Sequence, residues 1–267
     1  MARIAMVTGA ASGIGEAIAR RLANDGCHVV VSDLDAVGAE RVASEIGGRD
    51  GSAEGVGLDV TDAAAVNTAV DGVVARHGQL DVLVNNAGIL AHRQDVVDRV
   101  GAAMMAEMAG EVPEPTSILS TLSDELWDRT IKVHLYGTFH GLRAALRHME
   151  PARRGWIVNL ASIYGLNPSP LTPEYAAAKH AIVGLTESTG REVAGLGIHV
   201  NAVAPGYIDT PLLSAYDDVM RSLITSRIPA KSMGRPEDVA ALVSWLASDE
   251  ARYSYGEVHE VTGGARG

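Results

Sequence analysis

The segment Thr8–Gly15, with the sequence TGAASGIG, lies between a short apolar run, Ile4–Thr8, and an amphipathic stretch, Gly13–Asn24. This order predicts a strand, a tight turn and a helix. Glycines let the backbone turn sharply and approach a pyrophosphate, and a helix N-terminus offers free N–H groups and a positive dipole end. The residues expected to bind the phosphates of a dinucleotide are Gly9, Ser12, Gly13, Ile14 and Gly15.

The glycine spacing is Gly-x-x-x-Gly-x-Gly, which differs from the commonest dinucleotide fingerprint, Gly-x-Gly-x-x-Gly. A mononucleotide P-loop would need a lysine where Glu16 stands. The alternative is a glycine-rich turn without a ligand. The position of the turn at a strand–helix junction near the N-terminus favours dinucleotide binding.

Short apolar runs alternate with longer helical patterns along the chain, and several runs are apolar throughout, as in parallel strands buried on both faces. This alternation predicts one doubly wound (Rossmann) α/β domain over residues 1–267, with a seven-stranded parallel sheet and helices on both faces. The expected strands are Ile4–Thr8, His28–Ser32, Ala53–Leu58, Val82–Asn85, Gly155–Leu160, Ile198–Val203 and Glu257–Val261. The expected helices are Gly13–Asn24, Ala36–Ile46, Ala63–His77, Asp124–His148, Pro173–Ala194 and Pro236–Ser248.

Two segments interrupt this alternation. The first, residues 89–123, is longer than an ordinary loop and contains an amphipathic stretch, Val96–Met108. The second, residues 210–232, also carries a helical pattern. Ligands of such sheets bind beyond the carboxyl ends of the strands, so both segments are candidates to cover a substrate. Each could instead be a surface elaboration or a subunit contact; a lid is favoured for residues 210–232 only.

The net charge of −11 disfavours phosphate backbones and anionic lipids as partners. Cys27 is the only cysteine, so no intrachain disulfide is possible, which fits a reducing compartment. The sequence has neither a long apolar run nor a signal-peptide pattern. We therefore expect a cytoplasmic protein that binds neither nucleic acid nor membranes, and no metal-ligand set is predicted.

Asp33 ends the second expected strand, where an acidic side chain can accept hydrogen bonds from the hydroxyls of an adenosine ribose. The same carboxylate would repel a 2′-phosphate. No basic residue adjoins it in sequence, since Ser32 and Leu34 flank it, and Ala11 of the glycine turn is not basic. Asp35 is better placed to cap the next helix, which leaves Asp33 for the ribose. The prediction is NAD rather than NADP.

Tyr175 and Lys179 stand four residues apart on an expected helix and therefore share a face. A tyrosine pKa of about 10 is too high for a base near neutral pH, and lowering it by about 3 units requires roughly 4 kcal/mol. A neighbouring ammonium and a positive nicotinamide ring can supply this stabilisation. Ser162 follows the strand before this helix, where its hydroxyl can hold a substrate oxygen. In isolation, such a Tyr–Lys pair is usually an exposed surface pair without a catalytic role.

The ordered set of motifs resembles a short-chain dehydrogenase/reductase along nearly the whole chain. It comprises the TGxxxGxG turn, Tyr-x-x-x-Lys (Tyr175–Lys179) and the strand end at Ser162. The other matching segments are Leu58-Asp59-Val60, Asn85-Asn86-Ala87-Gly88, Pro205-Gly206-Tyr207-Ile208-Asp209-Thr210 and Val261-Thr262-Gly263-Gly264.

The resemblance implies hydride transfer between nicotinamide and a carbinol carbon. Tyr175 would be the general base in oxidation and the acid in reduction, and Ser162 would position the substrate oxygen. Lys179 would bind the nicotinamide ribose and lower the tyrosine pKa. Cofactor contacts are also implied for Leu34, Asp59, Val60, Asn86, Ala87, Gly88, Pro205, Gly206, Ile208 and Thr210. A homotetramer or homodimer is expected, with contacts through the helices around His134 and Tyr175.

His134 is a departure from the family, whose members commonly carry an asparagine there that links through water to the lysine. Residues 120–150 contain no asparagine. A neutral histidine has one donor and one acceptor and can serve the same proton relay. It can equally well be a packing residue, and the sequence does not decide between the two.

The function predicted on these grounds is an NAD(H)-dependent oxidoreductase that interconverts a secondary alcohol and its ketone. The alternatives are a non-catalytic NAD-binding redox sensor and a nucleotide-sugar epimerase or dehydratase of the extended branch. A redox sensor need not keep Ser162, Tyr175 and Lys179. An epimerase or dehydratase of the extended branch usually has a larger C-terminal substrate region than the one that follows Thr210 here. The substrate stays open among hydroxyacyl thioesters and cyclic, terpenoid or steroid alcohols. The residues expected to form a largely apolar pocket are Tyr164, Leu166, Pro168, Pro170, Leu212 and Leu213.

Overall fold

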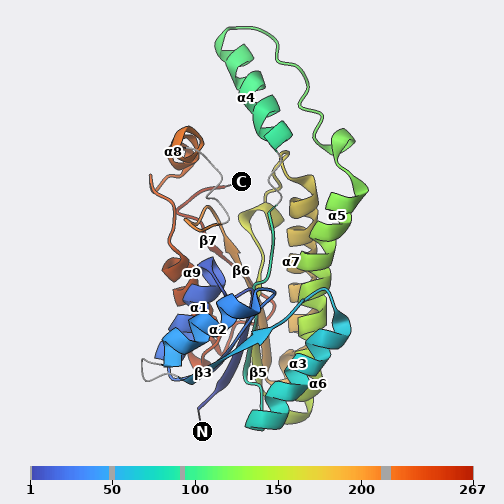
Figure 1. Ribbon diagram of the computed structural model, residues 1–267, viewed down its shortest axis with the longest axis vertical. Helices are drawn as coiled ribbons and strands as arrows, with labels where there is room; N and C mark the ends of the chain where they lie inside the picture. Colours follow the sequence, from blue (N-terminus) through green and yellow to red (C-terminus); the bar gives the residue numbers. More distant parts are fainter. Residues whose placement is uncertain (1, 48–51, 91–93, 212–217, 267) are drawn as a thin grey trace.

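The computed structural model of the chain describes residues 2–47, 52–90, 94–211 and 218–266. Within these residues, seven parallel strands form one sheet in the order β3-β2-β1-β4-β5-β6-β7 (Figure 1). The strands are β1 Ile4–Thr8, β2 His28–Asp33, β3 Ser52–Gly57, β4 Val82–Asn85, β5 Gly155–Leu160, β6 Ile198–Pro205 and β7 Val258–Val261. The predicted doubly wound parallel sheet is confirmed, with strand ends shifted by one or two residues.

Helices cover both faces of the sheet. One face packs against α1 (Gly13–Asn24), α2 (Ala36–Gly47) and α9 (Pro236–Leu246). The other packs against α3 (Ala63–His77), α6 (Gly137–Ala152) and α7 (Pro173–Val193). None of the described helices combines the length and apolar character needed to cross a bilayer.

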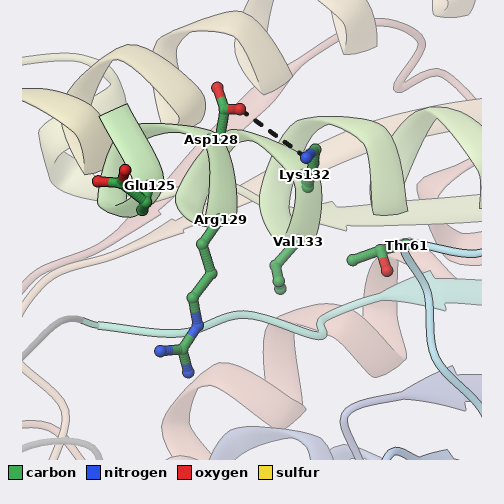
Figure 2. Close-up of a pocket in the computed structure, with 6 residues that line it drawn as sticks. All are labelled: Thr61, Glu125, Asp128, Arg129, Lys132 and Val133. Atoms are coloured by element: carbon green, nitrogen blue, oxygen red, sulfur yellow. Dashed lines mark ion pairs between the residues drawn. The ribbon is translucent and has the colours of Figure 1, made fainter. Parts of the chain in front are cut away.

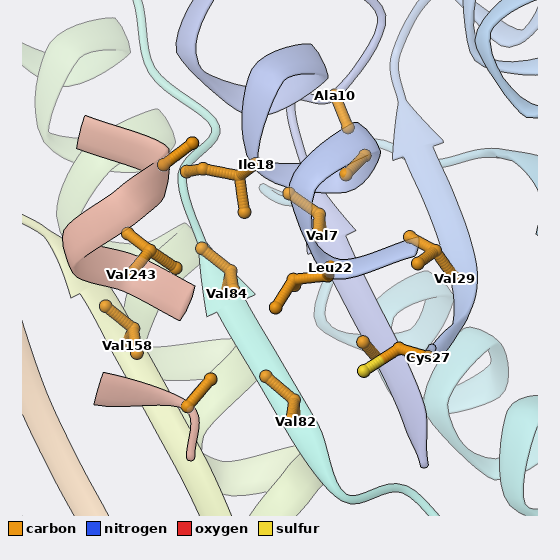
Figure 3. Close-up of a cluster of buried hydrophobic side chains, with 14 of the residues drawn as sticks. Val7, Ala10, Ile18, Leu22, Cys27, Val29, Val82, Val84, Val158 and Val243 are labelled. Carbon is orange, nitrogen blue, oxygen red and sulfur yellow. The ribbon is translucent and has the colours of Figure 1, made fainter. Parts of the chain in front are cut away.

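Alternation along each strand divides the core between these faces. In β1, Val7 points toward α1 and Met6 toward α3, because successive side chains of a strand point to opposite faces. Figure 3 shows the first cluster, in which Ile18 and Leu22 of α1 pack over the central strands. Every residue of β1, β5 and β6 is buried, which explains why these strands are almost continuously apolar in sequence.

The order of the strands creates a switch point at the carboxyl end of the sheet. The chain moves outward from β1 to β2 and β3, and then returns to β4 on the other side of β1. The loops that follow β1 and β4 therefore diverge, and ligands of doubly wound sheets bind at this switch point. The glycine turn follows β1, so it lies at this position.

The single long helix expected at Asp124–His148 is wrong in one respect. The structure has α5 (Asp124–Ile131), a π-helical turn (Lys132–Tyr136) and then α6. A π turn accommodates a side chain that regular helical geometry would place elsewhere, and such turns are frequent at functional sites. Here the turn brings His134 against Gly88, where an added Cβ would lie 2.5 Å from His134 Cε1.

The two interrupting segments each contain a helix. Residues 89–123 include α4 (Gln94–Met108), which projects beyond the end of the sheet in Figure 1. Arg99 of α4 donates hydrogen bonds to Thr116 O (3.2 Å) and Thr121 Oγ1 (3.1 Å). Residues 210–232 include α8 (Asp218–Arg227), but Leu212 and Leu213 lie outside the described residues.

Candidate active site

The glycine turn depends on glycine for two different physical reasons. Gly9 and Gly13 have φ of +64° and +56°, a backbone conformation that strains other residues. A Cβ at Gly15 would lie 2.1 Å from Gly9 O and 2.5 Å from Asn86 Nδ2, so the turn packs too closely for any side chain there. A Cβ at Gly13 would be 3.6 Å from Thr210 Cβ, an ordinary contact distance.

The N-terminus of α1 is available to an anion. Ser12 is the N-cap residue, and its side chain makes no capping hydrogen bond within the described part of the chain. The first-turn N–H groups, including that of Ile14, therefore lack the usual side-chain acceptor. Glu16 in the same turn is neutralised by Arg20 (2.7 Å) and Arg41 (3.3 Å). The turn thus has the features that a pyrophosphate requires.

Asn86 braces the glycine turn against the end of β4. Its Nδ2 donates to Thr8 O and Gly9 O, both at 2.9 Å. Its backbone N–H and that of Ala87 donate to Thr8 Oγ1 at 3.0 and 3.1 Å. The residues Asn86 and Ala87, predicted as cofactor contacts, therefore lie at the turn and hold its shape. Sequence reasoning missed the Thr8 hydroxyl, which joins β1 to β4.

Asp33 lies at the carboxyl end of β2, as predicted, but its carboxylate already accepts hydrogen bonds from the protein backbone. Its Oδ2 accepts from Ala11 N and its Oδ1 from Asp35 N, both at 3.0 Å. Asp35 caps α2 by accepting from Gly38 N at 3.0 Å. Each Asp33 oxygen keeps a second lone pair for a ribose hydroxyl.

A basic residue lies closer to this position than the sequence indicated. Arg41 of α2 donates to Ala11 O at 2.9 Å, and the N–H of the same alanine donates to Asp33. Its guanidinium also pairs with Glu16 and, at 3.0 Å, with Glu45. The fold therefore places a cation beside the glycine turn, with two carboxylates that neutralise it.

The predicted adenine segment lies at the end of β3. Leu58 N donates to Asp33 O at 2.7 Å, which ties this segment to β2. The exposed Asp59 accepts from Thr61 N at 2.8 Å. Val60 packs on Gly137 of α6, where an added Cβ would lie 2.8 Å from Val60 Cγ2. Leu34, also predicted here, is 75% exposed and so is accessible to a ligand.

Ser162, Tyr175 and Lys179 meet at the carboxyl end of β5. Ser162 is buried and caps a 3₁₀ turn (Ile163–Gly165) by accepting from Tyr164 N at 3.2 Å. Tyr175 lies in the first turn of α7, close enough to Ser162 for the serine side chain to favour its phenolate. Lys179 Nζ is buried, donates to Leu160 O at 2.6 Å and lies 5.6 Å from the centre of the Tyr175 ring.

The electrostatics of this group differ from the expectation. Burial raises the pKa of Tyr175, although the hydrogen bond with Ser162 opposes the shift. Burial lowers the pKa of Lys179 to about 7. The protein alone therefore does not lower the tyrosine pKa, because the Lys179 ammonium is directed at a backbone carbonyl and is itself costly to charge.

His134 lies edge-on to Tyr175, with 5.2 Å between ring centroids. Its Nε2 is 2.7 Å from Ile89 O and 3.1 Å from Ile89 N, so one nitrogen serves either group according to the tautomer. Its buried Nδ1 has no hydrogen-bond partner among the described residues. Burial and the nearby Lys179 lower the pKa of His134 to about 3, so the ring is neutral at physiological pH.

The segment predicted to lie beside the nicotinamide returns to the glycine turn. Pro205 ends β6, and Gly206 N donates to Val261 O of β7 at 2.9 Å. Ile208 is buried and forms a parallel bridge with Gly234. Thr210 then lies next to Gly13. Residues distant in sequence thus come together beside the glycine turn.

Tyr207 is an aromatic residue of the segment Pro205–Thr210, and sequence reasoning missed its contact with Tyr164. The hydroxyls of Tyr164 and Tyr207 are 2.7 Å apart, and the Tyr164 ring stands edge-on to Tyr175 with 6.5 Å between centroids. The aromatic pair therefore adjoins the predicted substrate position. The mixed polar and apolar pattern of residues 162–171 carries no signal for the Tyr207 contact.

A surface pocket of about 390 Å³ lies elsewhere, between α5 and the β3–α3 connection (Figure 2). Figure 2 shows an Asp128–Lys132 ion pair (3.8 Å) at its rim. The pocket is lined by Thr61, Glu125, Asp128, Arg129, Lys132 and Val133. None of these residues belongs to the predicted site, so this pocket is separate from the Ser–Tyr–Lys group.

Comparison with known proteins agrees with this fold. A family model described as "short chain dehydrogenase" matches residues 3–220. The chain is 40% identical to cis-4-hydroxycyclohexanecarboxylate dehydrogenase of Sinomonas cyclohexanicum, over 98% of this chain and 96% of that protein. It is 35% identical to 3-oxoacyl-[acyl-carrier-protein] reductase of Thermotoga maritima (98% and 97%) and of Escherichia coli (98% and 96%). The chain therefore belongs to the short-chain dehydrogenase/reductase family of oxidoreductases.

Proposed function

We propose that the protein is an NAD(H)-dependent oxidoreductase that interconverts a secondary alcohol and its ketone. The observation that carries the proposal is the meeting of Ser162, Tyr175 and Lys179 beside the segment that returns to the glycine turn. When bound, NAD supplies the hydride acceptor and, in its oxidised form, a positive charge that favours a nearby phenolate.

Tyr175 is the proposed general acid/base, because the Ser162 side chain lies beside it and favours its phenolate. Ser162 donates to the substrate oxygen and aligns it with the tyrosine proton. Lys179, whose pKa is about 7, gains and loses a proton readily near neutral pH, which suits a proton carrier.

His134 is proposed to extend this proton path. Its Nδ1 is buried without a partner among the described residues, and a polar site of this kind is where a bound water is expected. Since the pKa of about 3 keeps the ring neutral, His134 takes part as a hydrogen-bonding group and not as an imidazolium.

NAD is proposed over NADP on the position of Asp33. Its carboxylate keeps lone pairs for ribose hydroxyls and carries a charge that opposes a 2′-phosphate. Arg41 is the residue that could favour NADP, but its charge is paired with Glu16 and Glu45.

The substrate is proposed to be a secondary alcohol or ketone with an apolar body. Both kinds of relative named above act, by their names, on an oxo group or on a ring hydroxyl. Tyr164 and Tyr207 present aromatic surface next to Tyr175. We propose residues 210–232 as the segment that covers the substrate, while residues 89–123 are assigned no role.

The proposed assembly is a cytoplasmic homotetramer or homodimer. Trp127, Tyr136 and Phe139, on α5, the π-helical turn and α6, are 39%, 49% and 41% exposed, which favours a partner on this face. Light scattering coupled to gel filtration measures the assembly size directly.

The test is a screen for NAD reduction against secondary alcohols. The panel contains cis-4-hydroxycyclohexanecarboxylate, a 3-hydroxyacyl thioester and cyclic, terpenoid and steroid alcohols, each with NAD and with NADP. We expect turnover of at least one alcohol with NAD, and its loss in Tyr175→Phe. NAD binding with equal activity in Tyr175→Phe and the parent would overturn the assignment of the acid/base.

A further inference from the structure

Two histidines and a glutamate converge at the amino-terminal end of the sheet. The potential ligand atoms of His28, Glu54 and His77 all lie within 4.8 Å of one another. His77 Nε2 is 3.2 Å from Glu54 Oε1, and the His28 and His77 rings are 4.4 Å apart between centroids. All three residues are partly buried.

The fold explains why these residues meet. Val30 of β2 pairs with Glu54 of β3 and packs in the core cluster that includes α3, so Glu54 shares the face that α3 covers. His28, two residues before Val30, points to the same face. His77 is the last residue of α3, which crosses this face. The three residues are far apart in sequence, and so their spacing predicts no metal site.

We propose that His28, Glu54 and His77 form a binding site for a borderline divalent transition-metal ion, with zinc as the reference ion. Two imidazoles and a carboxylate are a donor set that binds Zn²⁺, at bond lengths of about 2.0–2.2 Å. Tetrahedral bonds of this length place ligand atoms roughly 3.4 Å apart. The His77–Glu54 pair already meets this distance, and small side-chain rotations bring in His28.

Arg76 is the group that opposes a cation here. Its Nη2 donates to Glu54 Oε1 at 2.7 Å, but its side chain is 48% exposed. An exposed ion pair of this kind contributes little and can open toward solvent. The bound ion would replace Arg76 as the partner of the carboxylate.

A metal ion at this site would link β2, β3 and α3, at a distance from the proposed active site. His28 begins β2 and Asp33 ends it, so the two lie at opposite ends of one strand. Binding would therefore stabilise the fold without completing the active site.

The experiment is calorimetric titration of the tag-free full-length chain with ZnCl₂, with MgCl₂ as the comparison ion. We expect one zinc ion per chain and no magnesium binding. His77→Gln and Glu54→Gln each weaken zinc binding by about tenfold or more, and Arg76→Gln strengthens it. Glu54→Gln keeps a similar shape, and circular dichroism verifies that each variant is folded.

His148→Gln is the matched control. His148 also pairs with a carboxylate, Asp71, at 2.7 Å and beside an arginine, but no second histidine joins that pair among the described residues. Zinc at about 100 times Kd should raise the melting temperature of the parent and of His148→Gln by about 5 °C or more, but not that of His77→Gln. No zinc binding, or zinc binding that is equal in the parent and His77→Gln, would overturn the proposal.

Discussion

Lys179 is 4% exposed, and replacing it with methionine removes the amine while keeping a side chain of similar length. In the unfolded chain this lysine has its ordinary pKa of 10.5, and in the folded protein burial lowers the pKa to about 7. Between these two values the unfolded state binds more protons, so the stability of the parent rises with pH. The penalty for burying Lys179 is fully present below pH 7 and disappears above the pKa of the unfolded state.

The size of the pKa shift of Lys179 sets the size of its effect on the free energy of unfolding. At 1.36 kcal/mol for each pH unit between the two pKa values, Lys179 costs the folded state about 4 kcal/mol at pH 7 and about 2 kcal/mol at pH 9. The methionine variant does not carry this penalty. We therefore expect the free energy of unfolding of the parent, relative to Lys179→Met, to increase by about 2 kcal/mol from pH 7 to pH 9.

Urea unfolding at a fixed protein concentration and both pH values measures this difference. Lys132→Met is the matched control, since its side chain is 57% exposed. Lys132→Met should keep the same offset from the parent at both pH values. The reasoning is refuted if Lys179→Met also follows the parent with a constant offset.

Substitutions at three further positions test other parts of the proposed site. His134→Asn should keep most of the turnover and His134→Ala should lose much of it, whereas a kcat and pH profile unchanged in His134→Ala would defeat the proton path. Asp33→Ser should raise kcat/KM for NADP relative to NAD by about tenfold or more, because a like charge leaves the 2′ position; an unchanged ratio would remove Asp33 as the determinant. Gly15→Ala should abolish NAD binding and lower the free energy of unfolding by roughly 1–3 kcal/mol, since its Cβ would lie 2.1 Å from Gly9 O. NAD binding equal to that of the parent would contradict this packing argument. Gly184→Ala is its control, because a Cβ there meets nothing within 4 Å.

The sequence was sufficient for features that depend on local pattern. Buried parallel strands are continuously apolar, so β1, β5 and β6 were located within two residues of their ends. The glycine turn is also local, because Gly9 and Gly13 are required by their own φ angles. The Tyr–Lys pair was expected to share a helix face because four residues make about one helical turn, and the family resemblance supplied its role.

Features that depend on register and packing were not accessible in the same way. The π-helical turn places His134 against Gly88, the residue three positions after β4, and helical periodicity does not encode this contact. Arg41 reaches the glycine turn because α2 packs beside it. The lowered pKa of Lys179 and the raised pKa of Tyr175 arise from burial, which the sequence pattern indicates only for whole elements.

The most direct test of the central claim compares kcat of Tyr175→Phe and of Tyr253→Phe for the first alcohol that the screen identifies as a substrate. Tyr253 is 97% exposed and lies outside the Ser–Tyr–Lys group, so its variant loses the same hydroxyl without changing that group. We predict that Tyr175→Phe still binds NAD but lowers kcat by about 10²–10⁴-fold, and that Tyr253→Phe is unchanged. Parent-like kcat in Tyr175→Phe would contradict the assignment of this tyrosine as the acid/base of the reaction.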